Sequence, residues 1–204
     1  MRYNKIMGIA RDIELLYEVS AFRNVERVWK QFLGTEVANN AEHTFRVIWI
    51  ALTLGKYEGK VNLEKIIKMA LIHDFEESRC GDVHYLSRQY TKRDKKMAIE
   101  DIFEGTILHD EFIKIFDEYE KRKTKESKIV KDADNLDVQI ELSEIANKGN
   151  KLSATWKKHR DKYVYPKLFT KSARKFWQAF YKSNPHDWHL KSPRNRFNAG
   201  DWKR

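Results

Sequence analysis

Apolar residues recur at helical spacing along most of this chain, and little in the sequence interrupts them. Ile13, Leu16 and Tyr17 follow Ile9 at offsets of 4, 7 and 8 residues, the spacing that places side chains on one face of a helix. The 204 residues include only eight glycines and three prolines, the residues that most often end a helix. Because alternation with a period of two is absent over any useful length, we predict an all-α fold.

Capping and stop signals divide this helical pattern into segments. Asn39 and Asn40 are good N-cap residues for a helix that runs to Gly55, and Asn62 opens the next helix. The predicted helices span about residues 4–19, 25–33, 40–55, 62–74, 92–103, 110–123, 126–147 and 172–181. After them we expect irregular chain around Pro185 and Pro193.

The net charge of +10 is concentrated in the last quarter of the chain. Residues 148–204 contain 16 lysines and arginines but three acidic residues, a net charge of +13, which leaves −3 for residues 1–147. The chain of 204 residues is long enough for one domain with a sizeable core and at most a small appendage. We therefore divide the chain into a main domain, residues 1–147, and a basic, aromatic-rich helical C-terminal extension, residues 148–204, packed on the same domain.

Composition excludes several classes of protein. Hydrophobic residues make up 41% and aromatic residues 13% of the chain, too much for a disordered protein. The most apolar stretch, residues 47–54, is far shorter than the ~20 residues that span a membrane, and no apolar segment typical of a secretory signal follows Met1. Cys80 is the single cysteine, which excludes an internal disulfide and a cysteine-based zinc site. We expect a soluble, cytoplasmic protein with no membrane partner.

Polar residues occupy positions on the apolar faces of three predicted helices. They are His43, the adjacent pair His73 and Asp74, and Asp134. Each one alone is most simply a core residue satisfied by hydrogen bonds, but buried carboxylates are costly unless they are paired or bind a cation. One divalent metal ion bound by all four would remove these costs together. Imidazole and carboxylate ligands suit Mn, Co, Ni, Fe, Zn or Mg, so the identity of the metal stays open.

The same residues resemble the signature of the HD-domain metal-dependent phosphohydrolases. His43 in Ala-Glu-His-Thr, the pair His73-Asp74, and Asp134 in Lys-Asp-Ala-Asp-Asn-Leu match its H…HD…D pattern. The run from Ala70 to Asp82 resembles the HD-x-x-E-x-x-x-G-D element of the short 5′-deoxynucleotidase-like branch. The resemblance covers about residues 10–145. It implies an HD-domain helical bundle around one metal site, with His43, His73, Asp74 and Asp134 as the ligands.

The resemblance also implies roles for neighbouring residues. Glu77 and Asp82 would be catalytic, with Glu77 taking a proton from the attacking water or orienting it, and Asp82 holding a sugar hydroxyl or assisting the leaving oxygen. The implied substrate-binding residues are Trp29, Arg23, Arg27 and Lys131. Trp29 lies 14 residues before His43, as in that branch, but Val28 stands where some members have an arginine. Trp29 as a core aromatic, Lys131 as a surface lysine and Glu76 as a solvated acid are the alternative interpretations.

The extension interleaves its basic residues with aromatic ones, a composition typical of surfaces that bind single-stranded nucleic acid. Phe176, Trp177, Phe180 and Tyr181, however, follow the i, i+1, i+4, i+5 spacing of a helix packed on a core, and we prefer that interpretation for them. Both interpretations stay open for residues 193–202.

We predict a metal-dependent phosphohydrolase that removes the 5′-phosphate of (deoxy)nucleoside monophosphates by attack of metal-bound hydroxide. One alternative is a phosphodiesterase or pyrophosphohydrolase that acts on a larger nucleotide, because the metal ligands do not fix the leaving group. Another is a nucleic-acid-binding protein with an auxiliary HD site. A nucleotide substrate is the expected partner, and nucleic acid on the extension and a homodimer are further expectations.

Overall fold

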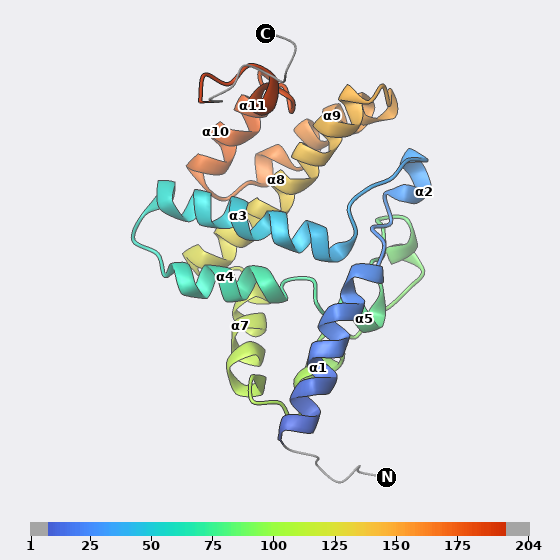
Figure 1. Cartoon of the computed structure of the whole chain (residues 1–204), viewed down its shortest axis with the longest axis vertical. Coiled ribbons are helices and arrows are strands. Elements are labelled where there is room, and N and C mark those ends of the chain that lie inside the picture. Colours follow the sequence, from blue (N-terminus) through green and yellow to red (C-terminus); the bar gives the residue numbers. More distant parts are fainter. Residues whose placement is uncertain (1–7, 195–204) are drawn as a thin grey trace, which may run out of the picture.

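The computed structural model describes residues 8–194, and these residues form helices joined by short loops (Figure 1). The α-helices are α1 (Ile9–Ala21), α2 (Lys30–Leu33), α3 (Asn40–Glu58), α4 (Leu63–Ile72), α5 (Glu77–Cys80), α6 (Lys95–Phe103), α7 (His109–Lys121), α8 (Lys125–Asn147), α9 (Leu152–Tyr163), α10 (Lys171–Phe180) and α11 (Asp187–Leu190). Three 3₁₀ turns accompany them: η1 (Phe22–Asn24), η2 (Ser87–Gln89) and η3 (Tyr165–Lys167). Between residues 8 and 194 the only β-pairing is an isolated antiparallel bridge from Glu26 to Asn39. The all-α prediction is confirmed.

Helix α3 begins where the sequence predicts but runs past its predicted end. The Asn39 side chain accepts a hydrogen bond from the Glu42 backbone, and the Glu42 side chain accepts one from the Asn39 backbone, so the capping box is complete. The predicted stop at Gly55 is wrong. This glycine is helical, and a Cβ there would come within 3.0 Å of Ile66 and Leu63, so Gly55 allows α3 and α4 to pack closely. Gly59, at φ 59°, follows the end of the helix instead.

Two other segments differ from the sequence prediction. The helix predicted over residues 25–33 shrinks to α2, because Val25 is extended and its carbonyl accepts a hydrogen bond from the Asn40 backbone. Helix α4 ends at Ile72, and a tight turn separates His73 from the short helix α5. This turn, rather than one continuous helix, carries the chain from His73 to Glu77.

The main core lies between α3, α4, α7 and α8, where Val47, Met69, Tyr119 and Leu136 are almost fully buried. The predicted extension takes part in it, because Leu168, Ala173 and Trp177 belong to the same cluster of buried side chains. Helices α9 and α10 lie against α8 (Figure 1). Phe176 and Phe180 are half-buried against the core, whereas Tyr181 is exposed, contrary to its predicted place inside. A boundary after residue 147 stays a prediction.

Helix α1 lies at one edge of the molecule (Figure 1). Leu15 is buried, but Ile9, Ile13, Leu16 and Tyr17, the residues at helical spacing, are exposed. Across residues 8–194, no helix is both long enough and apolar enough to cross a membrane.

Candidate metal and substrate site

The four predicted metal ligands come together from three helices. His43 lies in the first turn of α3, His73 and Asp74 follow the end of α4, and Asp134 lies in the middle of α8. One ligand atom from each residue lies within 4.8 Å of the others. The Nε2 atoms of the two imidazoles are 3.2 Å apart, and His43 Nε2 is 3.4 Å from a carboxylate oxygen of Asp134.

The other ring nitrogen of each histidine is occupied by a hydrogen bond. His73 Nδ1 lies 2.8 Å from the Ala70 carbonyl, and His43 Nδ1 lies 2.6 Å from a carboxylate oxygen of Asp137. A carbonyl only accepts hydrogen bonds, so Nδ1 of His73 donates, and its Nε2 is the ring nitrogen that faces the site. Two Nε2 atoms and two carboxylates that converge on one point are a donor set that fits a divalent cation.

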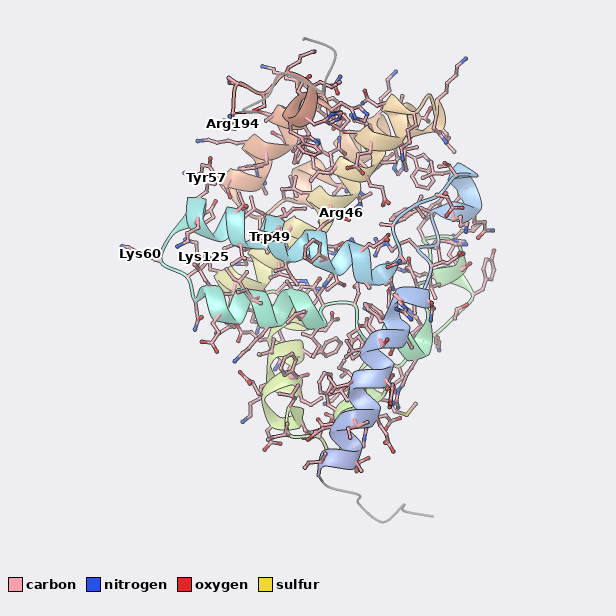
Figure 2. The ribbon with its side chains drawn as sticks, in the orientation of Figure 1. Arg46, Trp49, Tyr57, Lys60, Lys125 and Arg194 are labelled. Atoms are coloured by element: carbon pink, nitrogen blue, oxygen red, sulfur yellow. The ribbon has the colours of Figure 1, made fainter. Side chains whose placement is uncertain are left out.

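Asp137 was not predicted from the sequence. It is fully buried on α8, one turn after Asp134, and also accepts hydrogen bonds from Arg46, which is labelled on α3 in Figure 2. Its spacing of three residues from Asp134 is the signal that would have revealed it, because a second acid on the same helical face needs a buried partner.

The ionisation of the site reflects this crowding of opposite charges. Burial alone would raise the pKa of Asp134, but the ammonium of Lys131 and the imidazole of His43 hold that pKa well below its ordinary value. Burial opposes protonation of His43, yet its contacts with the carboxylates of Asp134 and Asp137 outweigh burial and raise its pKa to about 10. In the absence of metal, a proton on His43 therefore offsets part of the negative charge of the carboxylates.

Glu77 lies beside the four residues with its side chain almost fully buried. Its two oxygens accept hydrogen bonds from Asn40 Nδ2, at 2.8 Å, and from Arg93 Nη1, at 3.0 Å. Burial, followed by the negative charges of Asp74 and Asp82, raises the pKa of Glu77 to about 8. A carboxyl with such a pKa exchanges protons near neutral pH, as a general base requires.

Asp82 and Arg27 hold each other at the wall of the site. One Asp82 oxygen accepts a hydrogen bond from the Val28 backbone at 3.2 Å and lies 3.9 Å from Arg27 Nε. Arg27 is buried, and its Nη1 is 3.4 Å from an Asp74 oxygen. Asp82 therefore fixes the segment of residues 27–29 next to the metal ligands.

Of the other predicted substrate-binding residues, Lys131 and Trp29 lie at the site and Arg23 does not. Lys131 Nζ is 2.7 Å from Asp134, and Trp29 lines the same cavity while its ring lies edge-on to Trp156, with centroids 5.3 Å apart. Arg23 is not brought to the site. It is exposed on η1 and lines a separate surface hollow, because the extended chain after η1 turns Arg27 inward and leaves Arg23 outside. Glu76 is not a solvated acid, since it is fully buried and 2.5 Å from Lys95 Nζ.

A cavity of about 360 Å³ opens onto these residues and is rich in cations, of which only Arg27 and Lys131 were singled out from the sequence. It is lined by the proposed ligands Asp74 and Asp134, by Glu77 and Asp82, and by the cationic side chains of Arg27, Arg88, Arg93, Lys95, Arg122, Lys131 and Arg160. Their sequence positions range from 27 to 160, so only the tertiary fold brings them together. The arrangement suits a small substrate that carries negative charge.

Comparisons with known proteins agree with this geometry. A family model described as the HD domain matches residues 19–182. A 5′-deoxynucleotidase from Danio rerio is 30% identical over 137 residues, which are 63% of this chain and 67% of that protein. A 5′-deoxynucleotidase from Dictyostelium discoideum is 31% identical over 164 residues, 74% of this chain and 82% of that protein. A conserved hypothetical protein from Pyrococcus furiosus shares the fold with a TM-score of 0.69 at 24% identity, over 84% of this chain and 99% of its own.

Proposed function

This chain belongs to the HD domain family, and we propose that it is a metal-dependent phosphohydrolase that removes the 5′-phosphate of deoxynucleoside monophosphates. The observation that carries the proposal is the convergence of His43, His73, Asp74 and Asp134 within 4.8 Å of one another, with the carboxyl of Glu77 beside them. Two relatives that are about 30% identical to this chain over the aligned residues are 5′-deoxynucleotidases, which supports the choice of substrate.

His43, His73, Asp74 and Asp134 hold one divalent metal ion. When bound, such an ion lowers the pKa of water and stabilises negative charge on phosphoryl oxygens. Glu77 takes the proton of the attacking water, because its buried carboxyl has a pKa of about 8 and lies next to the ligands. Asn40 and Arg93 fix the orientation of that carboxyl through their hydrogen bonds.

The substrate lies in the cavity that the ligands open onto. Lys131 and Arg27 neutralise the charge of the phosphate, and Trp29 forms the wall next to the sugar. Asp82 has one oxygen on the Val28 backbone, and its other oxygen is the acceptor for a sugar hydroxyl or the group that assists the leaving oxygen.

The decisive experiment replaces the proposed base. Glu77→Gln keeps the shape of the side chain, so the protein should retain its metal by elemental analysis but release phosphate from deoxynucleoside monophosphates at least ~10²-fold more slowly. Glu118→Gln, a half-exposed acid that pairs with Lys65, is the control and should leave turnover unchanged. Loss of metal from Glu77→Gln would make Glu77 a ligand, and unchanged turnover would exclude it as the base.

A phosphodiesterase or pyrophosphohydrolase activity on a larger nucleotide is the alternative within the same site. Phosphate release and nucleotide products should be measured over a panel of mono-, di- and cyclic nucleotides, with each candidate metal added to chelator-treated protein. Preference for a diester or a pyrophosphate over all monophosphates would replace the proposed substrate.

Three finer expectations form part of this proposal. The exposed lysines of the C-terminal region, among them Lys151, Lys167, Lys175 and Lys182, favour a polyanionic partner such as RNA or DNA. The affinity for such a partner should fall steeply as the salt concentration rises, and an affinity that does not depend on salt would exclude phosphate contacts.

A single, half-buried cysteine suits a cytoplasmic location. A homodimer is the proposed assembly, because an exposed apolar groove lies between α1, α3 and α4.

A further inference from the structure

The cations around the cavity differ in whether a carboxylate faces them. Four of them form salt bridges, with nitrogen–oxygen distances between 2.5 and 3.4 Å. The pairs are Arg27 with Asp74, Arg93 with Glu77, Lys131 with Asp134 and Lys95 with Glu76. Arg160 differs from these four, because it has no acid within 4.0 Å among residues 8–194.

Arg160 reaches the cavity from α9, which follows the motif-bearing residues 10–145 of the sequence. Its Nη2 donates a hydrogen bond to the carbonyl of Asn135 at 2.7 Å, which places it next to the proposed ligand Asp134. The ring of Trp177 lies 5.4 Å from its guanidinium carbon. The carbonyl and the ring fix the position of the guanidinium, whereas its Nε is buried and has no hydrogen-bond partner within the described part of the chain.

The guanidinium of Arg160 is therefore largely enclosed and forms no salt bridge within residues 8–194. Burial lowers the pKa of Arg160 to about 10, and the carboxylate of Asp134 only partly opposes this effect, to which the nearby charge of Arg27 adds. An anion bound in the cavity would place a negative charge beside this guanidinium and offset the cost of enclosing it. The planar fork of a guanidinium matches the oxygens of a phosphate group better than a point charge does.

We propose that Arg160 binds the phosphoryl group of the substrate and, after hydrolysis, the inorganic phosphate product. The inference rests on the proposed function for the identity of that phosphoryl group, but not for the binding of phosphate itself. It makes α9 a wall of the site, with Trp156 of the same helix packed against Trp29. Neither the metal ligands nor the predicted substrate-binding residues include a side chain from α9.

The test compares the affinity of three metal-loaded proteins for inorganic phosphate, measured by calorimetry and as product inhibition. The affinity of Arg160→Gln for phosphate should be at least about tenfold lower than that of the wild type, the scale expected when a charged hydrogen bond is lost. Its metal content should stay unchanged. Arg174→Gln is the matched control, since Arg174 also donates to a backbone carbonyl and lies over an aromatic ring, but outside the cavity. Equal phosphate affinity in wild type and Arg160→Gln, or an equal loss in Arg174→Gln, would overturn the inference.

A second measurement needs no variant and therefore does not depend on the folding of Arg160→Gln. Phenylglyoxal attacks arginines, and peptide mapping reports the rate at each one. Inorganic phosphate should slow the modification of Arg160 and leave Arg174 unaffected; the absence of protection at Arg160 would contradict the inference. If phosphate protects Arg160 in the wild-type protein but that protein hydrolyses no nucleotide, the proposed function is refuted and the anion site is supported.

Discussion

At the scale of single residues, the metal site depends on groups that do not contact the metal. Asp137 fixes the imidazole of His43 and is itself held by Arg46, so it sets the direction of one proposed ligand. Asp137→Asn should lower the affinity for divalent metal by about 10–100-fold, as removal of such an outer partner does in metal sites. Chelator competition followed by elemental analysis measures this loss.

The same helix supplies the control. Asp132 is also fully buried on α8, but it accepts hydrogen bonds from the Phe169 and Thr170 backbones and from the Thr170 hydroxyl. Asp132→Asn should lower the temperature of unfolding without changing metal affinity. If both variants lose metal equally, the loss reports general damage to α8 rather than the orientation of His43.

Proton release should accompany metal binding. The pKa of His43 is about 10 without metal, so its imidazole carries a proton at neutral pH that the metal must displace. The apparent affinity should rise about tenfold per pH unit from pH 7 to pH 9 and level off above pH 10. Calorimetry in two buffers with different ionisation enthalpies should report about one proton released per metal bound. No proton release at pH 7 would show that His43 is neutral before metal binds.

At the scale of helices, the C-terminal region belongs to the core rather than forming a detachable arm. A chain cut after Asn147 loses Leu168, Ala173 and Trp177 from the main cluster, and removal of one buried tryptophan alone costs about 3–5 kcal/mol of unfolding free energy. This truncated protein should be insoluble or lack a cooperative unfolding transition in circular dichroism. A cut before Pro193 should leave both folding and turnover intact. A cooperative transition in the protein cut after Asn147 would show that residues 1–147 fold alone.

Helical periodicity predicted the parts of the molecule that depend on local spacing. The cap at Asn39 follows from local spacing, whereas the grouping of His43, His73, Asp74 and Asp134 was predicted from their places on apolar helix faces and from their resemblance to a family signature. Helix α9 was missed because it buries only Ser153 and carries charged residues on most sides. Its function in the site depends on the side of α8 against which it packs.

The same reasoning explains the errors at the edges of the site. Arg23 and Arg27 are four residues apart, a spacing that on a helix would place them together, but extended chain separates them. The apolar residues at helical spacing on α1 are exposed, because periodicity reveals a face without revealing what covers it. Both outcomes depend on contacts between segments that are far apart in the sequence.

At the scale of the whole molecule, an exposed apolar groove has no part in the site. Leu16 and Val19 of α1, Phe45 of α3, Leu71 of α4 and Leu108 line it together. Trp49, labelled on α3 in Figure 2, lies against Phe45 and is 60% exposed. Contiguous apolar surface of this kind is unusual on a monomer and typical of an interface between proteins.

We propose that a second copy of the chain occupies this groove. Helix α1 contributes exposed apolar residues to the groove, so two copies related by a two-fold axis can bury each other's apolar surface. The wild-type protein should therefore sediment as a dimer, and Leu16→Glu should sediment as a monomer at the same concentration, because a charge cannot be buried there without a partner. Tyr90→Glu is the control, since Tyr90 is 84% exposed and lies outside the groove. A monomeric wild-type protein would refute the dimer, and a dimer that survives Leu16→Glu would place the interface on another face.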